Sequence, residues 1–314
     1  MSRTETAWLL GRLFGGALVA LACGAGQALA TTFGVAMTLP VASTPRLHDS
    51  LEEHARARSL LLRFAYAPEG AAEQQIAQVR DLIAAKVDAL LVMPVRPAVT
   101  AAITRLAREA DIPLVYINDG PREDWLAGRV ALVIPNDLVA GRLQMRKLAQ
   151  MMHGTGRLAI LSGRPDEAGS ILRTRGIKEV MAEFPGLQLV AEGAADGKRR
   201  TASTLVSGWL AEGTAIDAIA ASNDAMAIGA ADAVEASGLP MGRILIGGIG
   251  AIADAIQAMQ QKRLAVTLHQ DATLQGRRAI DDALALIAHR PVPQYDWVPF
   301  TLVTDRISTM QFSK

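Results

Sequence analysis

The chain has 314 residues, of which 50% are hydrophobic and 20% are charged, and this is the composition of a folded globular protein. Its 32 basic and 31 acidic residues leave a net charge of +1, and aromatic residues make up only 4%, which excludes the basic, aromatic surface of a nucleic-acid-binding protein. A single cysteine excludes a disulfide framework and a cysteine-rich metal site.

The first thirty residues have the pattern of a secretory signal peptide. Arg3 and Arg12 come before an uncharged apolar run, Leu13–Cys23, and the small-x-small sequence Ala28–Ala30 follows it. The run is short for a membrane span, which needs about 20 apolar residues. We therefore expect residues 1–30 to be removed and the protein to reach the periplasm. Two alternatives remain open, an uncleaved anchor and a lipoprotein anchored through Cys23.

Short apolar runs then alternate with segments of helical period. The expected strands are Phe33–Leu39, Leu60–Ala65, Ala89–Met93, Leu114–Ile117, Val130–Ile134, Leu158–Leu161, Leu187–Ala191, Ala218–Ala221, Ile244–Gly248, Ala265–Leu268 and Val298–Val303. The expected helices are Ala72–Ala85, Ala98–Ala110, Leu138–Met152, Leu172–Phe184, Thr201–Glu212, Ala225–Ser237, Ala253–Gln261 and Leu274–His289.

This alternation predicts an α/β fold with doubly wound parallel sheets that helices cover on both faces. About eleven strands are many for one open sheet, so we expect two sheets in two lobes. In the first expected helix, Ile76, Val79 and Leu82 share the apolar face, which places Gln75 on a polar face.

Polar side chains follow several of the expected strands, at the edge where open α/β sheets bind ligands. Their amides, carboxylates and guanidinium groups can each make paired hydrogen bonds, which suits neighbouring hydroxyls of a sugar or polyol. Several of them are equally suited to cap a helix. The set includes Arg46, Arg96, Asn118, Asp119, Arg164, Arg173, Asn223, Gly250, His269 and Gln270.

Five segments, in order and spacing, resemble the periplasmic sugar-binding proteins of the ribose-binding type, the type I solute-binding proteins of ABC importers. They are Gln75–Ile83 with Val87–Ala89, Ile112–Asn118, Leu172–Gly176, Ser222–Gly229 and Thr267–Gln270. The resemblance runs from Thr31 to the C-terminus. It implies two lobes joined by three crossings, with residues 31–135 and 271–301 in the N-terminal lobe and residues 136–270 and 302–314 in the C-terminal lobe.

The resemblance also implies the ligand-binding residues. Arg173, Asn223 and Gln270 match positions that hold sugar hydroxyls in the family, while Asn118 and Asp119 fall where the family often has an aspartate and an arginine. Gly250 stands where the family usually has another aspartate.

Arg46 lies in an element that normally carries aromatic residues, and the usual aromatic of the C-terminal lobe falls near Gly197. The aromatic sandwich over the sugar ring is therefore expected to be absent, with Trp125, Tyr66 and Tyr116 as candidate replacements, although Tyr116 lies within a strand.

These departures leave the ligand open. A sugar or polyol is favoured, but Arg46, Arg96, Arg164 and Arg173 together suit an anionic ligand, and Asp119 suits an amine. We expect an exported, monomeric solute-binding protein that closes on a small polar ligand and delivers it to an ABC permease in the inner membrane. The alternative is a ligand-sensing subunit for a membrane histidine kinase or chemoreceptor. No nucleophile–base set or metal-ligand spacing appears, so no enzyme activity, cofactor or metal is expected.

Overall fold

A computed structural model describes residues 30–38, 44–121, 123 and 125–304. The signal-peptide prediction for residues 1–30, Cys23 and residues 305–314 of the predicted C-terminal lobe fall outside the described residues, apart from Ala30. Thr31–Lys314 forms one unit, separate from Met1–Ala30. Among the described residues, no helix combines the length and the apolar character that crossing a membrane requires.

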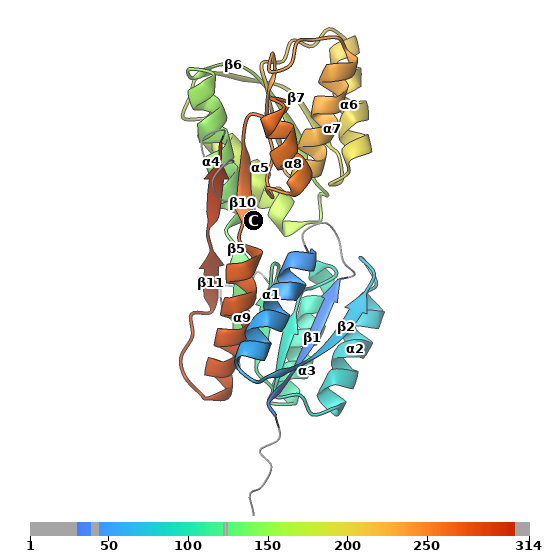
Figure 1. The fold of residues 1–314 in the computed structure, drawn as a ribbon, viewed down its shortest axis with the longest axis vertical. Coiled ribbons are helices and arrows are strands. Elements are labelled where there is room, and N and C mark those ends of the chain that lie inside the picture. Colours follow the sequence, from blue (N-terminus) through green and yellow to red (C-terminus); the bar gives the residue numbers. More distant parts are fainter. Residues whose placement is uncertain (1–29, 39–43, 122, 124, 305–314) are drawn as a thin grey trace, which may run out of the picture. The chain divides into compact units, whose positions relative to one another are not determined.

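The first sheet contains six strands, all parallel, in the order β11-β5-β4-β3-β1-β2. Their bounds are β1 Thr32–Thr38, β2 Leu61–Ala67, β3 Ala89–Val92, β4 Leu114–Ile117, β5 Val130–Pro135 and β11 Tyr295–Val298. Every residue of β3 and β4 is buried, as expected for central strands with helices on both faces. The helices are α1 Thr44–Ala57 and α9 Ala272–Ile287 on one face, and α2 Ala72–Ala84, the 3₁₀ turn Pro97–Val99 and α3 Thr100–Glu109 on the other (Figure 1).

The second sheet has the parallel order β7-β6-β8-β9. Its strands are β6 Thr155–Ser162, β7 Gly186–Ala194, β8 Ala218–Ala221 and β9 Leu245–Gly247. One face packs on α6 Arg199–Ala211, α7 Asp224–Ala236 and α8 Ala253–Gln260, and the other on α4 Asp137–Met151 and α5 Ala168–Met181. These two sheets with their helices are the two predicted lobes.

The chain passes between the sheets three times. The first passage joins β5 to α4, and the second joins β10 Thr267–Gln270 to α9. Strand β10 lies beside the end of β9, where Gly248 N donates to Val266 O at 2.9 Å and Gly250 N donates to Leu268 O at 2.7 Å. The third passage runs from β11 to β12 Phe300–Val303, which pairs with β10.

The prediction of a single last strand over Val298–Val303 is wrong, because the structure has two strands there. Val298 ends β11 in the first sheet, and Phe300 begins β12, which runs antiparallel to β10. Pro299 lies between them and has no N–H to donate, so it separates the two ladders. The β10–β12 pair is also the exception to the expected all-parallel pairing.

Two helix expectations need correction. Helix α1 begins at Thr44, so Arg46 lies in its first turn and not in a loop after β1. Gln75 is fully buried. Its Nε2 donates to Met93 O at 2.8 Å and its Oε1 accepts from Val95 N at 2.9 Å, which satisfies backbone groups after β3.

Gln144 and Gln275 act in the same way at other strand ends. Gln144 Nε2 donates to Ala221 O at 2.9 Å, and Gln275 Nε2 donates to Val133 O at 3.0 Å. Both side chains are buried, so each bond is shielded from water. Buried glutamines on helices therefore fix the strand ends from which the candidate site is built.

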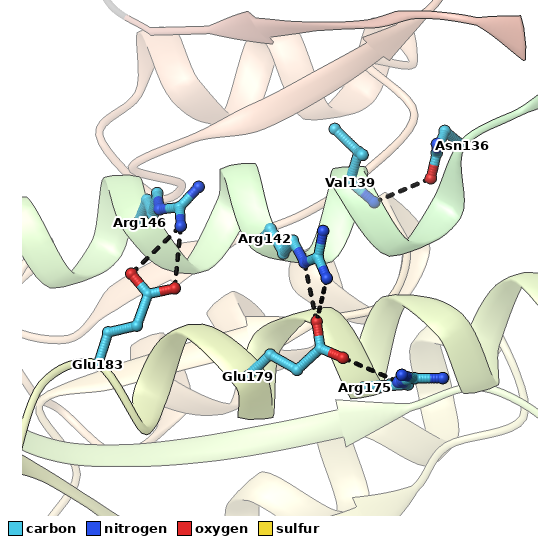
Figure 2. Close-up of polar contacts among 7 residues, drawn as sticks. All are labelled: Asn136, Val139, Arg142, Arg146, Arg175, Glu179 and Glu183. Carbon is cyan, nitrogen blue, oxygen red and sulfur yellow. Dashed lines mark hydrogen bonds and ion pairs between the residues drawn. The ribbon is translucent and has the colours of Figure 1, made fainter.

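Helices α4 and α5 approach closely because two glycines face the neighbouring backbone. A Cβ at Gly141 would overlap Arg173 O, and a Cβ at Gly176 would overlap Leu138 O. Along the outer side of this pair, Glu179 of α5 accepts from Arg142 of α4 at 2.8 Å and from Arg175 at 2.8 Å (Figure 2).

Gly176→Ala should destabilise the protein by about 1–3 kcal/mol, because the added methyl overlaps the backbone of α4 and forces the helices apart. Alanine alone would favour a helix interior by about 1 kcal/mol, so the sign of the change reports the overlap. Gly208→Ala in α6 is the matched control, since no atom lies within 4 Å of its added Cβ, and it should be neutral or stabilising. Urea unfolding measures both, and equal effects would contradict the close approach.

Candidate ligand-binding site

Arg173 is held by two elements at the carboxyl edge of the second sheet. Its Nε donates to Asp137 Oδ1 at 2.7 Å, and its Nη1 donates to the backbone oxygen of Ser222 at 2.8 Å. The two side chains of this ion pair are only 15% and 11% exposed. The guanidinium carbon lies 5.7 Å from the ring centre of Phe300, within the range of a cation–π contact.

Local sequence explains why Asp137 meets Arg173. Asn136 caps α4 by accepting from Val139 N at 3.2 Å, so Asp137 becomes the first residue of the helix (Figure 2). The close approach at Gly141 then brings the backbone of Arg173 against α4. Ser222 follows β8 directly, and its carbonyl completes the set of partners.

Asn223 serves first as a helix cap. Its Oδ1 accepts from Met226 N at 2.8 Å, and its Nδ2 donates to Gly197 O at 3.2 Å. The bond to Gly197 joins the end of β8 to the loop after β7. Asn223 therefore lies at the same edge as Arg173, with both ends of its amide already bonded to the protein.

Gln270 and Asn118 connect the β10–β12 pair to the loop after β4 of the first sheet. Gln270 Nε2, at the end of β10, donates to Asn118 Oδ1 at 2.6 Å. Asn118 follows β4 and has a φ of 69°, a left-handed conformation that asparagine tolerates better than most residues. Next to it, Asp119 Oδ1 accepts from the N–H of Gly120 at 2.8 Å. These predicted residues do meet, and they do so across the lobes.

His269 precedes Gln270 on β10. Burial is the main cause that lowers the pKa of His269, and the positive charge of Arg46 adds to the effect while Asp271 opposes it. The imidazole is therefore neutral at pH 7. This effect places Arg46, which is exposed on α1, within electrostatic range of His269 on β10.

Gly250 belongs to a tight loop around Asp224. Asp224 is 2% exposed, and it accepts from Thr267 Oγ1 at 2.6 Å and from Ile252 N at 2.9 Å. Gly250 has a φ of +136°, and a Cβ there would lie 3.1 Å from Asp224 Oδ2. A side chain at position 250 would thus be strained and would crowd a buried carboxylate, which explains why this chain has glycine where the family pattern has aspartate.

Two of the four arginines that the sequence grouped as a possible anion site are compensated by carboxylates. Arg173 pairs with Asp137, and Arg164 pairs with Asp166 at 3.3 Å and with Glu69 of the other lobe. Arg96 is exposed. Carboxylates therefore balance the charges of Arg164 and Arg173, the two members of the predicted set that lie on the second lobe.

One of the three candidate aromatic residues belongs to the core. Tyr116 is fully buried and donates from its hydroxyl to Thr100 O at 2.9 Å, which confirms that it belongs to the core. Trp125 is 77% exposed, and Tyr66 stacks on Phe64 with ring centres 5.8 Å apart. The aromatic ring in contact with Arg173 is that of Phe300, which the sequence analysis missed.

Two residues of this region, Asp137 and Phe300, were not among the expected site residues, and Asp224 was expected only as one of the polar residues that follow the strand ending at Ala221. Asp137, Asp224 and Phe300 are all buried and surround Arg173 or the Gly250 loop. Asp137 and Asp224 each follow an asparagine that caps a helix, and this Asn-Asp pair, directly after β5 or one residue after β8, was the available signal. Phe300 has no comparable signal, because its place depends on the crossing after Pro299.

Asp224 makes stability depend on pH. Burial raises the pKa of Asp224 to about 6, whereas a carboxyl in the unfolded chain titrates near pH 4. The native state therefore binds the proton more tightly, and the free energy of unfolding should fall as pH rises from about 4 to 6, by up to about 3 kcal/mol from this group. Denaturant unfolding at several pH values should show a flatter profile for Asp224→Asn.

Asp81→Asn on the exposed face of α2 is the control for that measurement and should keep the full slope. Burial also raises the pKa of Asp282 to about 7, so a residual slope of the same sign will remain in Asp224→Asn. An unchanged slope in that variant would mean that Asp224 does not titrate in this range.

Comparison with known proteins agrees with this architecture. Residues 35–291 match a family described as a periplasmic binding protein domain. A protein of Rhizobium meliloti named "Putative rhizopine-binding protein" is 37% identical over 82% of this chain and 84% of its own length. The xylitol-binding protein of Mycolicibacterium smegmatis is 30% identical over 84% of this chain and 76% of its own length.

A solved structure gives the same result. The ABC transporter solute-binding protein from Bacillus halodurans, with bound myo-inositol, is 31% identical and superposes with a TM-score of 0.81, over 90% of this chain and 98% of that one. Sequence and fold therefore agree, and the chain belongs to the periplasmic binding protein family, with the type I fold of the sugar-binding proteins of ABC importers.

Proposed function

We propose that this protein is the solute-binding component of an ABC importer and that its ligand is a neutral polyol or sugar, a cyclic polyol above all. The observation that carries the proposal is a contact between hydrogen-bonding side chains: Gln270 bonds Asn118 after β4, and Phe300, the residue opposite Gln270 in the β10–β12 pair, lies against Arg173. Relatives that bind xylitol and myo-inositol support the ligand class.

The charges of the site favour a neutral ligand. Arg173 is the cation of the site on the second lobe, and it is compensated by Asp137 at 2.7 Å. The charge of Arg173 also lowers the pKa of Asp224, so a second carboxylate lies within its field. An anionic ligand would gain little net attraction here, whereas hydroxyl groups can accept from the guanidinium and bond the two amides.

Ligand capture would proceed by hinge closure. We place residues 31–135 and 271–301 in the N-terminal lobe and residues 136–270 and 302–314 in the C-terminal lobe, with the three crossings as the hinge. Asn118, Asp119 and Arg46 belong to the first lobe, and Arg173, Asn223, Gly250 and Gln270 to the second. A ligand that bonds both groups stabilises the closed form over the open one by the difference in its contacts.

The cellular role follows from the same proposal. Residues 1–30 direct export and are removed, and the protein works as a monomer in the periplasm without catalysing a reaction. Its partner is an ABC permease of the inner membrane, which receives the closed, loaded form. The relatives are binding proteins, in keeping with a role that needs no chemistry at the site.

A thermal-shift panel of myo-inositol, xylitol, D-ribose, D-allose, D-xylonate and D-glucosamine tests the ligand class. A ligand at 100 times its Kd adds about 2.7 kcal/mol to the free energy of unfolding, which raises Tm by about 5–10 °C in a protein of this size. We expect neutral polyols or sugars to give the largest shift and xylonate to give little. If no neutral compound raises Tm, the proposed ligand class is wrong.

Gln270→Ala should weaken binding of the best neutral ligand about tenfold or more, because it removes an amide that bonds the ligand and also bonds the opposite lobe through Asn118. Its Tm without ligand should change little. Isothermal titration calorimetry gives the affinities, with Gln188→Ala on the exposed part of β7 as the matched control. If the two variants bind the ligand with equal affinity, Gln270 is not a ligand-binding residue.

A further inference from the structure

The buried pair of Asp137 and Arg173 has an effect on ligand choice that goes beyond holding helices together. We propose that Asp137 is a positioning and specificity-determining residue, which fixes Arg173 as a hydrogen-bond donor for uncharged hydroxyls and selects against anionic ligands. This inference rests on the proposed function, because it takes Arg173 to be a ligand-binding residue.

The geometry restricts the guanidinium on several sides. Asp137 Oδ1 accepts from Nε at 2.7 Å, Ser222 O accepts from Nη1 at 2.8 Å, and Phe300 lies against the group with its ring centre 5.7 Å from the guanidinium carbon. With Nε and Nη1 bound to the protein, Nη2 and the second hydrogen of Nη1 remain for a ligand. The guanidinium group of Arg173 is therefore oriented before any ligand binds, which reduces the conformational entropy lost on binding.

The same contacts connect Arg173 to the segments that cross between the lobes. Asp137 begins α4 directly after the first crossing, and Phe300 begins β12 directly after the third. Phe300 packs with Ala140, Ile249 and Leu268, and Leu268 belongs to β10, which leads into the second crossing. Movement of Arg173 would disturb all three crossings. By holding Arg173, Asp137 therefore also keeps the crossings in a fixed position relative to the bound ligand.

Because Asp137 compensates the charge of Arg173, a full cation is not available to the ligand. The side chains of Asp137 and Arg173 are 11% and 15% exposed, so water screens their interaction weakly. Removing the carboxylate while keeping the shape of the side chain would leave a buried guanidinium with an uncompensated charge. Such a group attracts any small anion that reaches it.

The test uses Asp137→Asn and compares one matched pair of probes and one simple anion. Xylitol and D-xylonate differ only in a terminal hydroxymethyl or carboxylate group, and inorganic sulfate reports the charge without the shape of a sugar. In the wild type, xylitol should bind better than xylonate, and sulfate should have no specific effect. In Asp137→Asn, the ratio of the two dissociation constants should shift toward xylonate by about tenfold, and sulfate should raise Tm above the wild-type response at equal ionic strength.

Three further variants separate this role from a structural one. Glu179→Gln removes a carboxylate that bonds two arginines on the same helix pair, on the outer side shown in Figure 2, and it should leave the ratio unchanged. Asp137→Glu keeps the charge and should restore the wild-type preference. The double variant Asp137→Asn with Arg173→Gln should lose the gain for xylonate and sulfate.

The outcomes distinguish the inference from the proposed function. If Asp137→Asn weakens xylitol and xylonate by the same factor and sulfate has no added effect, Asp137 is only structural and the inference is wrong. If the wild type binds no neutral polyol or sugar, the proposed function is wrong, and the sulfate response still decides the role of Asp137. If Asp137→Asn does not fold, Asp137→Ser takes its place with the same expected shift.

Discussion

The buried ion pair between Asp137 and Arg173 is the interaction on which the ligand-binding edge of this protein depends. It joins the start of α4 to the middle of α5, and it brings the end of β8 and the start of β12 to the same guanidinium group. An ion pair of this kind is costly to break, about 3–5 kcal/mol, because the remaining partner is left buried and charged. Its presence requires the close contact of two helices, which glycines at positions 141 and 176 permit.

Around this pair, buried polar groups hold the strand ends in place. Gln75 satisfies backbone groups beyond β3, Gln144 bonds the last residue of β8, and Gln275 bonds Val133 within β5, while Asp224 bonds the loop that contains Gly250. Each bond is shielded from water, so its loss would leave an unsatisfied group. The result is a rigid frame for loops whose own residues remain available to a ligand. Rigid strand ends and three crossings are what a hinge-closing binding protein needs.

The site differs from the arrangement that the family resemblance implies. Glycine at position 250 fits the tight loop around Asp224, where a side chain would be strained, and the aromatic partner of Arg173 comes from β12. Together with the paired arginines, these features favour a neutral polyhydroxylated ligand whose hydroxyl groups, and not an aromatic sandwich, supply the affinity. The bond of Asp137 to Arg173 is the basis of the charge selectivity that we propose for this residue.

Periodicity in the sequence determined the α/β class, the two lobes and most strand positions, because buried parallel strands such as Ala218–Ala221 are apolar throughout. The resemblance supplied Arg173, Asn223, Gln270 and Asn118, and the structure brings Gln270 onto Asn118. Only the tertiary structure decided what these side chains bond. The partners of Arg173 lie 36 and 49 residues away along the chain, and Phe300 reaches it through a crossing. Such contacts depend on how helices and strands pack against one another, and that packing cannot be inferred from local sequence patterns.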